Sequence, residues 1–310
     1  MSTTFISELA GLATAFFWAG SAMVWALLGK RVSPTAVASV RLALATAILA
    51  AIHWALYGTL WPAGIPPKAM WMLVFSGVIA AGLGDVCFFH GISLIGPRLS
   101  MTISSLAPIL AALIAWALPA HETMTSIEIV GMFLATGGVV WVVAEKSGRD
   151  AWPSTPASFR RGVLFNILSV IGQAVGFVSS HVGMNAFADK PVPAFSATLI
   201  RVGSAGIFCW GVLLFAGRAR ETAAAFRDRR LFSWLLFGVV AGPVVGIWFS
   251  MVALQGASTG IASTLISLSP LVLIPLSWFA YREKPTLGRV IATVVALAGV
   301  ALMMLKLQKS

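Results

Sequence analysis

Long apolar runs separated by short polar gaps dominate the pattern of this chain. Ten such runs recur, each of about 20 residues, which is long enough for a helix to cross ~30 Å of hydrocarbon. Most prolines fall in the gaps, where helices should end. The pattern therefore predicts an all-α integral membrane protein with ten transmembrane helices. The expected spans are residues 9–28, 36–57, 70–90, 99–118, 127–144, 162–184, 194–216, 231–254, 261–281 and 287–305.

Composition supports the membrane interpretation. The 310 residues are 59% hydrophobic and only 10% charged, whereas soluble chains are about half apolar and about one quarter charged. The net charge of +11 would suggest nucleic acid as the partner of a soluble protein. Here the Lys and Arg residues lie between the apolar runs, so a lipid bilayer is the expected partner and nucleic acid is not.

The distribution of Lys and Arg predicts the topology. Cytoplasmic connections carry an excess of these residues. One set of alternate gaps is strongly basic, and the other set, with both termini, is not. We therefore expect a multi-pass protein of the cell (inner) membrane with both termini outside, on the periplasmic side. The basic set consists of Lys30, Arg31, Arg98, Lys146, Arg149, Arg160, Arg161, Arg218, Arg220, Arg227, Arg229, Arg230, Arg282 and Lys284.

The sequence also repeats itself after about 160 residues, or five spans. Ser-Leu-Ala-Pro at 105–108 matches Ser-Leu-Ser-Pro at 267–270, and Arg41 matches Arg201. Because five is odd, the second copy must be inverted relative to the first. Inverted repeats are the architecture of alternating-access carriers, which bind solutes at the repeat interface.

We expect the first five-helix repeat at 1–146, a cytoplasmic linker at 147–161, and the second repeat at 162–310. With these paired motifs the chain resembles the drug/metabolite transporter superfamily, specifically its ten-helix EamA-type members. The resemblance implies a secondary transporter that exports amino acids and other small metabolites, with drugs or amphipathic cations as the alternative. It also implies a central cavity formed mainly by helices 1, 3, 4, 6, 8 and 9, and no cofactor.

Two ionisable residues share one depth near the cytoplasmic side. Arg41 and Asp85 each lie about five residues inside their spans, so an ion pair between neighbouring helices is feasible. The pair has two interpretations. It is structural, with Arg41 otherwise reaching toward the headgroups, or Asp85 is a proton or cation site.

Arg201 lies in the seventh span, and the spans of the second half hold no acidic residue to pair with it. Its expected neighbours by depth are Gln255, His181 and backbone carbonyls. One hypothesis is that Arg201 binds a substrate carboxylate or phosphate. The other is a folding role shared with Arg41.

Four further residues are candidates for substrate contact. Gln173 and Phe177 lie one turn apart near the middle of the sixth span, where a glutamine could equally join helices. Trp18 lies in the middle of the first span, away from the interfacial tryptophans, and Trp248 lies in the eighth. Core packing is the competing interpretation for Trp18.

Pro108 and Pro270 occupy matching places in the fourth and ninth spans. A proline removes a backbone hydrogen bond and bends a helix, so the two are candidate hinges. A static bend is the alternative.

Other function classes find little support. Gly256-Ala257-Ser258-Thr259-Gly260 fits the serine-hydrolase pattern but lies in a short turn without a marked base. The sequence has no metal-binding H-E-x-x-H and no nucleotide-binding P-loop, nor a filter-like channel motif. We expect no enzyme and no metal, with a small molecule as substrate. A proton as coupling ion, facilitated diffusion, the direction of transport and the oligomeric state all stay open.

Overall fold

The computed structural model describes residues 3–28, 34–118, 124–144, 155–187, 189, 191–217, 229–272 and 286–305. Over these ranges the regular structure is entirely helical. The first half contains α1 (Thr3–Leu28), α2 (Pro34–Tyr57), α3 (Pro67–Ser76), η1 (Gly77–Gly84), α4 (Asp85–Ser104), α5 (Ala107–Ala117) and α6 (Ser126–Ala144). The second contains α7 (Pro156–Asn185), α8 (Ala194–Phe215), α10 (Arg229–Val239), η2 (Val240–Gly246), α11 (Ile247–Gly256), α12 (Thr259–Ile266) and α14 (Leu287–Leu305).

The predicted ten-helix membrane fold is confirmed. Within the described ranges, nine helices are long and apolar enough to cross a bilayer, and Thr259–Val272 is a shorter apolar helix. This segment coincides with the first part of the predicted ninth span, whose remainder to residue 281 lies outside the described residues. The third span is longer than predicted, because it runs from Pro67 to Gly96. Gly96 then reverses the chain with a φ of 82°, which favours glycine.

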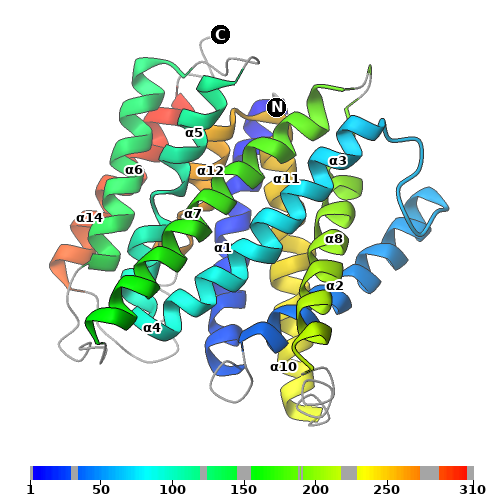
Figure 1. Cartoon of the computed structure of the whole chain (residues 1–310). Helices are drawn as coiled ribbons and strands as arrows, with labels where there is room; N and C mark the ends of the chain where they lie inside the picture. The colour runs from blue at the N-terminus through cyan, green and yellow to red at the C-terminus, as the bar shows by residue number, and fades with distance from the viewer. Residues whose placement is uncertain are drawn as a thin grey trace.

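The two repeats interlock (Figure 1). Helix α2 packs on α8, and α6 packs on α14, so each of these outer pairs joins equivalent helices of the two halves. Between the pairs, the third span (α3, η1 and α4) packs on α7, and the equivalent eighth span (α10, η2 and α11) packs on α1. Helices α5 and α12 meet each other at the centre. Because α1 begins and α14 ends at one end of the bundle (Figure 1), the number of crossings is even.

A π-helical segment interrupts the third and the eighth span at equivalent places. Segment η1 joins α3 to α4, and segment η2 joins α10 to α11. Asp85 is the first residue after η1, and Ile247 is the first after η2. Such π turns are uncommon and are frequent at functional sites. Both segments pack against the long first helix of the opposite repeat.

The sequence predicted that Pro108 and Pro270 lie within continuous helices, but in the structure each follows a break in its helix. The break at Ser105 and Leu106 precedes α5, and Ser267 and Leu268 form the equivalent break after α12. Both breaks close with an i→i+3 bond, from Leu106 N to Ile103 O and from Leu268 N to Leu265 O. A proline in the first turn of a helix costs no backbone bond, because that N–H has no helical partner. Their role as hinges stays a prediction.

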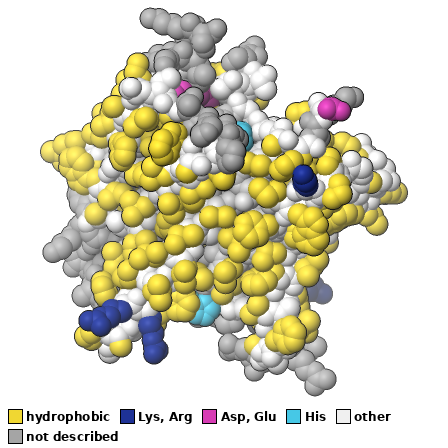
Figure 2. Space-filling model, turned by 45° about the horizontal axis from the view of Figure 1, so that its top comes forward, with side chains coloured by type: hydrophobic (Ala, Val, Ile, Leu, Met, Phe, Trp, Pro, Cys, Tyr) yellow, Lys and Arg dark blue, Asp and Glu magenta, His cyan; other side chains and the backbone are white. Residues whose placement is uncertain are grey.

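Apolar side chains cover most of the face in Figure 2, and Lys and Arg gather at its borders. Large side chains such as Trp71, Trp116 and Phe215 are more than half exposed. A water-exposed surface would not carry such a patch, so this face fits a lipid environment. Most of the basic residues used to predict topology lie in connections outside the described residues, and the predicted orientation stays a prediction.

Candidate substrate site

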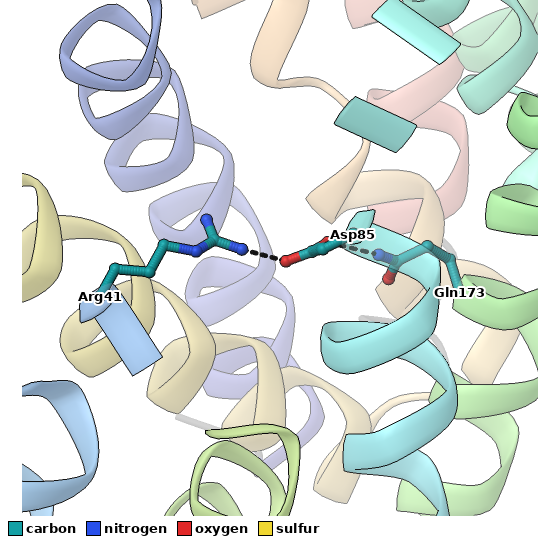
Figure 3. Close-up of polar contacts among 3 residues, drawn as sticks. All are labelled: Arg41, Asp85 and Gln173. Atoms are coloured by element: carbon teal, nitrogen blue, oxygen red, sulfur yellow. Dashed lines mark hydrogen bonds and ion pairs between the residues drawn. The ribbon is translucent and has the colours of Figure 1, made fainter. Parts of the chain in front are cut away.

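An ion pair and a hydrogen bond join helices α2, α4 and α7 at Asp85 (Figure 3). The carboxylate lies between Arg41 of α2 and Gln173 of α7. Arg41 Nη2 donates to Asp85 Oδ2, and Gln173 Nε2 donates to Asp85 Oδ1 over 3.3 Å. The structure thus brings together three residues that the sequence placed on separate helices. It also shows that the Arg41 side chain extends to Asp85.

Aromatic rings enclose the Arg41 guanidinium. Its central carbon lies 5.4 Å from the ring centres of both Trp25 and Phe89. Cation–π contacts of this kind stabilise a cation that has lost water. The side chains of Arg41 and Asp85 are 9% and 22% exposed, so Asp85 keeps more access to its surroundings than its partner has.

Arg201 occupies a second polar centre formed by α3, α7, α8 and α11. Its Nη1 donates to Ser180 Oγ over 2.9 Å and lies 3.9 Å from Met251 Sδ. Ser180 Oγ is 2.6 Å from Ser76 Oγ, so the contact extends to α3. The Arg201 guanidinium also lies over the Phe177 ring, 5.6 Å from its centre. Arg201 Nε has no hydrogen-bond partner among the described residues, which leaves donors unused.

Helix α7 connects the two centres. Gln173, Phe177 and Ser180 follow one another at i, i+4 and i+7, a spacing that places them on one face of the helix. Gln173 reaches Asp85, while Phe177 and Ser180 reach Arg201. At a rise of 1.5 Å per residue, this face covers about 10 Å along the axis. One face of α7 therefore carries both polar centres.

The site has an excess of positive charge. Asp85 is close enough to interact electrostatically with both Arg41 and Arg201. Two guanidinium groups and one carboxylate leave one positive charge without a counter-ion in this set. A ligand with its own carboxylate would supply that counter-ion.

Replacing Ser180 with alanine tests the Arg201 centre. The change removes the hydroxyl that accepts from Arg201 and contacts Ser76. We expect the free energy of unfolding to fall by about 1 to 2 kcal/mol, because a buried cation loses its acceptor. Ser179→Ala is the matched control, since Ser179 is also buried but is not among the partners of Arg201. Thermal unfolding in detergent measures both, and an equal effect in the two variants would contradict the assignment.

Trp18 and Gln173 contact equivalent glycines of the two repeats. A Cβ on Gly246, the last residue of η2, would lie 2.6 Å from Trp18 Cδ1, so any larger residue there would displace the Trp18 ring or the backbone. A Cβ on Gly84, the last residue of η1, would lie 3.9 Å from Gln173 Nε2. Both predicted residues therefore face the end of a π segment in the opposite repeat.

Trp248 packs in a row of aromatic rings and is not part of the polar centres. Its ring stacks on Phe249 at 5.2 Å and meets Phe195 edge-on at 5.9 Å. Phe249 in turn stacks on Phe17 of α1 at 5.8 Å. The Trp248 side chain is 37% exposed, so part of the ring stays accessible.

The hydrogen bonds described for Gln255 and His181 go to backbone carbonyls and not to Arg201. Gln255 Nε2 donates to Val192 O over 2.8 Å, and His181 Nδ1 lies 2.5 Å from Leu254 O. Depth alone placed these residues near Arg201, but their side chains join α7 and α11 to backbone carbonyls. Ser76, Ser180 and Met251 fill the places around Arg201. Their residue types carry no sequence signal that distinguishes them from other core residues.

A hollow of about 730 Å³ lies away from both polar centres, between the α2–α3 and α7–α8 connections. It is lined by residues 63–66, 186–187, 189 and 191–193. None of the predicted substrate residues takes part in it. The described residues also contain no group of three or more His, Cys, Asp or Glu that could hold a metal ion.

Comparison with known proteins identifies the protein family. The model of the EamA-like transporter family matches residues 5–144 and 160–305, which is nearly the whole chain in two copies. The chain belongs to the EamA-like transporter family. No curated protein matches the chain. A solved structure, described only as a crystal structure of protein, covers 98% of this chain and 99% of its own, with a TM-score of 0.74 at 15% identity. That likeness shows the fold alone.

Membership makes this EamA-like chain a multi-pass membrane transporter of small solutes. Membership in this family favours transport over catalysis. The surroundings of the serine-hydrolase pattern at 256–260 agree with this. There, Ser258 precedes α12 in a turn and does not stand on a strand-to-helix elbow. The family does not assign the solute, the coupling ion or the residues that bind them.

Proposed function

We propose that this chain is a secondary transporter that exports small zwitterionic metabolites such as amino acids by alternating access. The observation that carries the proposal is that Asp85 of α4 and Arg201 of α8 both contact one face of α7. An amino acid has an ammonium and a carboxylate group within a few ångströms, which is less than the about 10 Å covered by this face of α7, so the Asp85 and Arg201 side chains would extend toward each other from its two ends. Asp85 would bind the ammonium, and Arg201, with its unused donors, would bind the carboxylate.

The arrangement of the helices supports alternating access. The two polar centres lie where the first half meets the second, since Arg41 and Asp85 belong to one repeat and Gln173 and Arg201 to the other. Inverted-repeat carriers bind their solutes at such an interface. The equivalent breaks before Pro108 and Pro270 would let the fourth and ninth helices bend symmetrically.

Counterflow in proteoliposomes tests the proposal. Vesicles loaded with one unlabelled amino acid at a time are diluted into the labelled form, and saturable accumulation is expected for a subset of the panel. Arg201→Lys retains the charge but loses the two-pronged geometry, so we expect weaker apparent affinity for the carboxylate solute. No exchange with any amino acid, or equal exchange in this variant at equal protein amount, would refute the assignment.

A second candidate is export of amphipathic cations. The rings of Phe17, Phe249, Trp248 and Phe195 favour it, because aromatic faces attract cations and bury flat apolar groups. Ethidium is a suitable probe. Ethidium efflux that is lost in Trp248→Ala, together with no amino-acid counterflow, would favour this candidate over the first.

A further inference from the structure

Glu8 is a buried acid without a partner. The sequence places it before the first apolar run, but α1 begins at Thr3 and includes it. Its side chain is 0% exposed, and neither carboxylate oxygen has a hydrogen-bond partner among the described residues. An ionised carboxylate without water or donors is very costly. A fold that keeps such a group at membrane depth points to a role for it.

Apolar packing surrounds the residue on the side of α6 and α12. Leu12 and Ala15, one and two turns along the same face of α1, pack in a cluster with Ile261 and Leu265 of α12. Glu8 therefore lies at the end of this cluster, about 7 Å inside the helix start at 1.5 Å per residue. Water does not reach it in this arrangement, and nothing in the cluster can donate a hydrogen bond.

Among the described residues, no cation is found close to Glu8. Glu128 of α6 is close enough for its charge to act on Glu8, and its own carboxylate accepts from Thr125 N over 2.6 Å. The helices packed against α1 are α10, η2, α11 and α12. Of these, only α10 carries charged residues, Arg229 and Arg230 at its start, and that start lies at the opposite end of the bundle (Figure 1). His121 and Glu122 lie in a connection outside the described residues.

We propose that Glu8 is a proton-binding site that couples solute transport by this chain to a proton gradient. The carboxyl holds a proton in the closed arrangement described here and releases it when water reaches this end of α1. The proposal rests on the proposed transport function and names its coupling ion. We assign the proton to Glu8 and keep Asp85 for the substrate ammonium, because Asp85 has Arg41 and Gln173 as partners whereas Glu8 has no hydrogen-bond partner among the described residues.

Infrared spectroscopy of the purified full-length protein tests the proton site without any solute. Glutamate labelled with ¹³C at the side-chain carboxyl separates Glu bands from Asp bands. We expect wild type to show the carbonyl band of a protonated glutamic acid that disappears as pH rises. Glu8→Gln should lack this band, and the matched control Glu128→Gln should keep it. A band that persists in Glu8→Gln, or its absence from folded wild type, would overturn the proposal.

A second variant distinguishes loss of the proton-binding group from misfolding. Methionine matches glutamate in length and needs no hydrogen bonds, so Glu8→Met removes an unpartnered polar group from an apolar site. We expect its thermal unfolding temperature to equal or exceed that of wild type, with the infrared band lost. A lower unfolding temperature would show that the carboxyl group stabilises the fold, which contradicts an unpartnered acid kept for proton binding.

Proton flux then tests coupling. Proteoliposomes contain the pH-sensitive dye pyranine and receive a mixture of the standard amino acids outside. Wild type should change the internal pH, and Glu8→Gln should lose this change while it retains counterflow. If wild type shows counterflow but no proton flux, the coupling role of Glu8 is refuted, and the proposed transport of amino acids is not. Absence of both in wild type would refute the proposed transport of amino acids, and the infrared result would still decide whether Glu8 holds a proton.

Discussion

Asp85→Asn is expected to reduce counterflow at least about tenfold, which corresponds to about 1.4 kcal/mol of lost interaction. Asparagine retains the shape of the side chain and a carbonyl that can accept from Gln173. It loses the negative charge that pairs with Arg41 and that would bind a substrate ammonium. Initial rates of exchange in proteoliposomes, normalised to the amount of protein, measure the effect. Transport unchanged by this variant would remove Asp85 from the site.

A double variant separates binding from folding. Breaking one side of a buried ion pair destabilises a protein, because the remaining charge is left alone, whereas apolar residues on both sides are often neutral. Asp85→Leu combined with Arg41→Met should therefore restore the thermal stability that Asp85→Asn loses. It should not restore transport if Asp85 binds solute. Full recovery of both properties would show that the pair is structural only.

Gly138→Leu is expected to destabilise the protein by about 3 kcal/mol or more, because it separates α6 from α14. A Cβ on Gly138 would lie 2.6 Å from Ala292 O and 2.7 Å from Ala296 Cβ, and all of these atoms are buried between the two helices. Small residues allow membrane helices to approach closely in this way. Leucine would force the outer helix pair apart, so a lower unfolding temperature and aggregation during size-exclusion chromatography should follow.

The adjacent glycine provides the control. A Cβ on Gly137 would meet nothing within 4 Å, since this residue faces away from α14. Gly137→Leu should therefore elute and unfold like wild type. The same result for Gly138→Leu would mean that α6 and α14 are not held as closely as described. The pair isolates packing from helix propensity, because both substitutions replace glycine with leucine in the same helix.

The fold could be predicted from sequence because the bilayer imposes strict demands. A helix must be long and apolar to span hydrocarbon, so hydropathy located the spans and the repeat gave their inversion. Boundaries were less accurate where polar residues belong to a helix. The predicted first span begins after Glu8, although α1 includes this residue and the fold buries it completely. Hydropathy reports on lipid exposure and cannot tell when protein covers a charged residue.

The candidate site could be predicted only in part. Shared depth placed Arg41 near Asp85, because two adjacent helices fix the height of their residues. Depth does not fix direction around the helix axis, and the described hydrogen bonds of Gln255 and His181 go to Val192 O and Leu254 O instead of to Arg201. The contact between Gln173 and Asp85 was missed for a further reason. It depends on how α7 packs against α4, which no periodicity within either helix reveals.

The π segment η1 sets the direction in which Asp85 points. An α-helix turns by 100° at each residue, and a π turn holds about one residue more than an α turn. If residues 77–84 were wound as an ordinary α-helix, every side chain beyond them would be rotated by about 100° around the helix axis. Asp85, as the next residue, would then face away from Arg41 with its sequence position unchanged. The charge pairing at the centre of this transporter is therefore controlled by the winding of the backbone one turn before it.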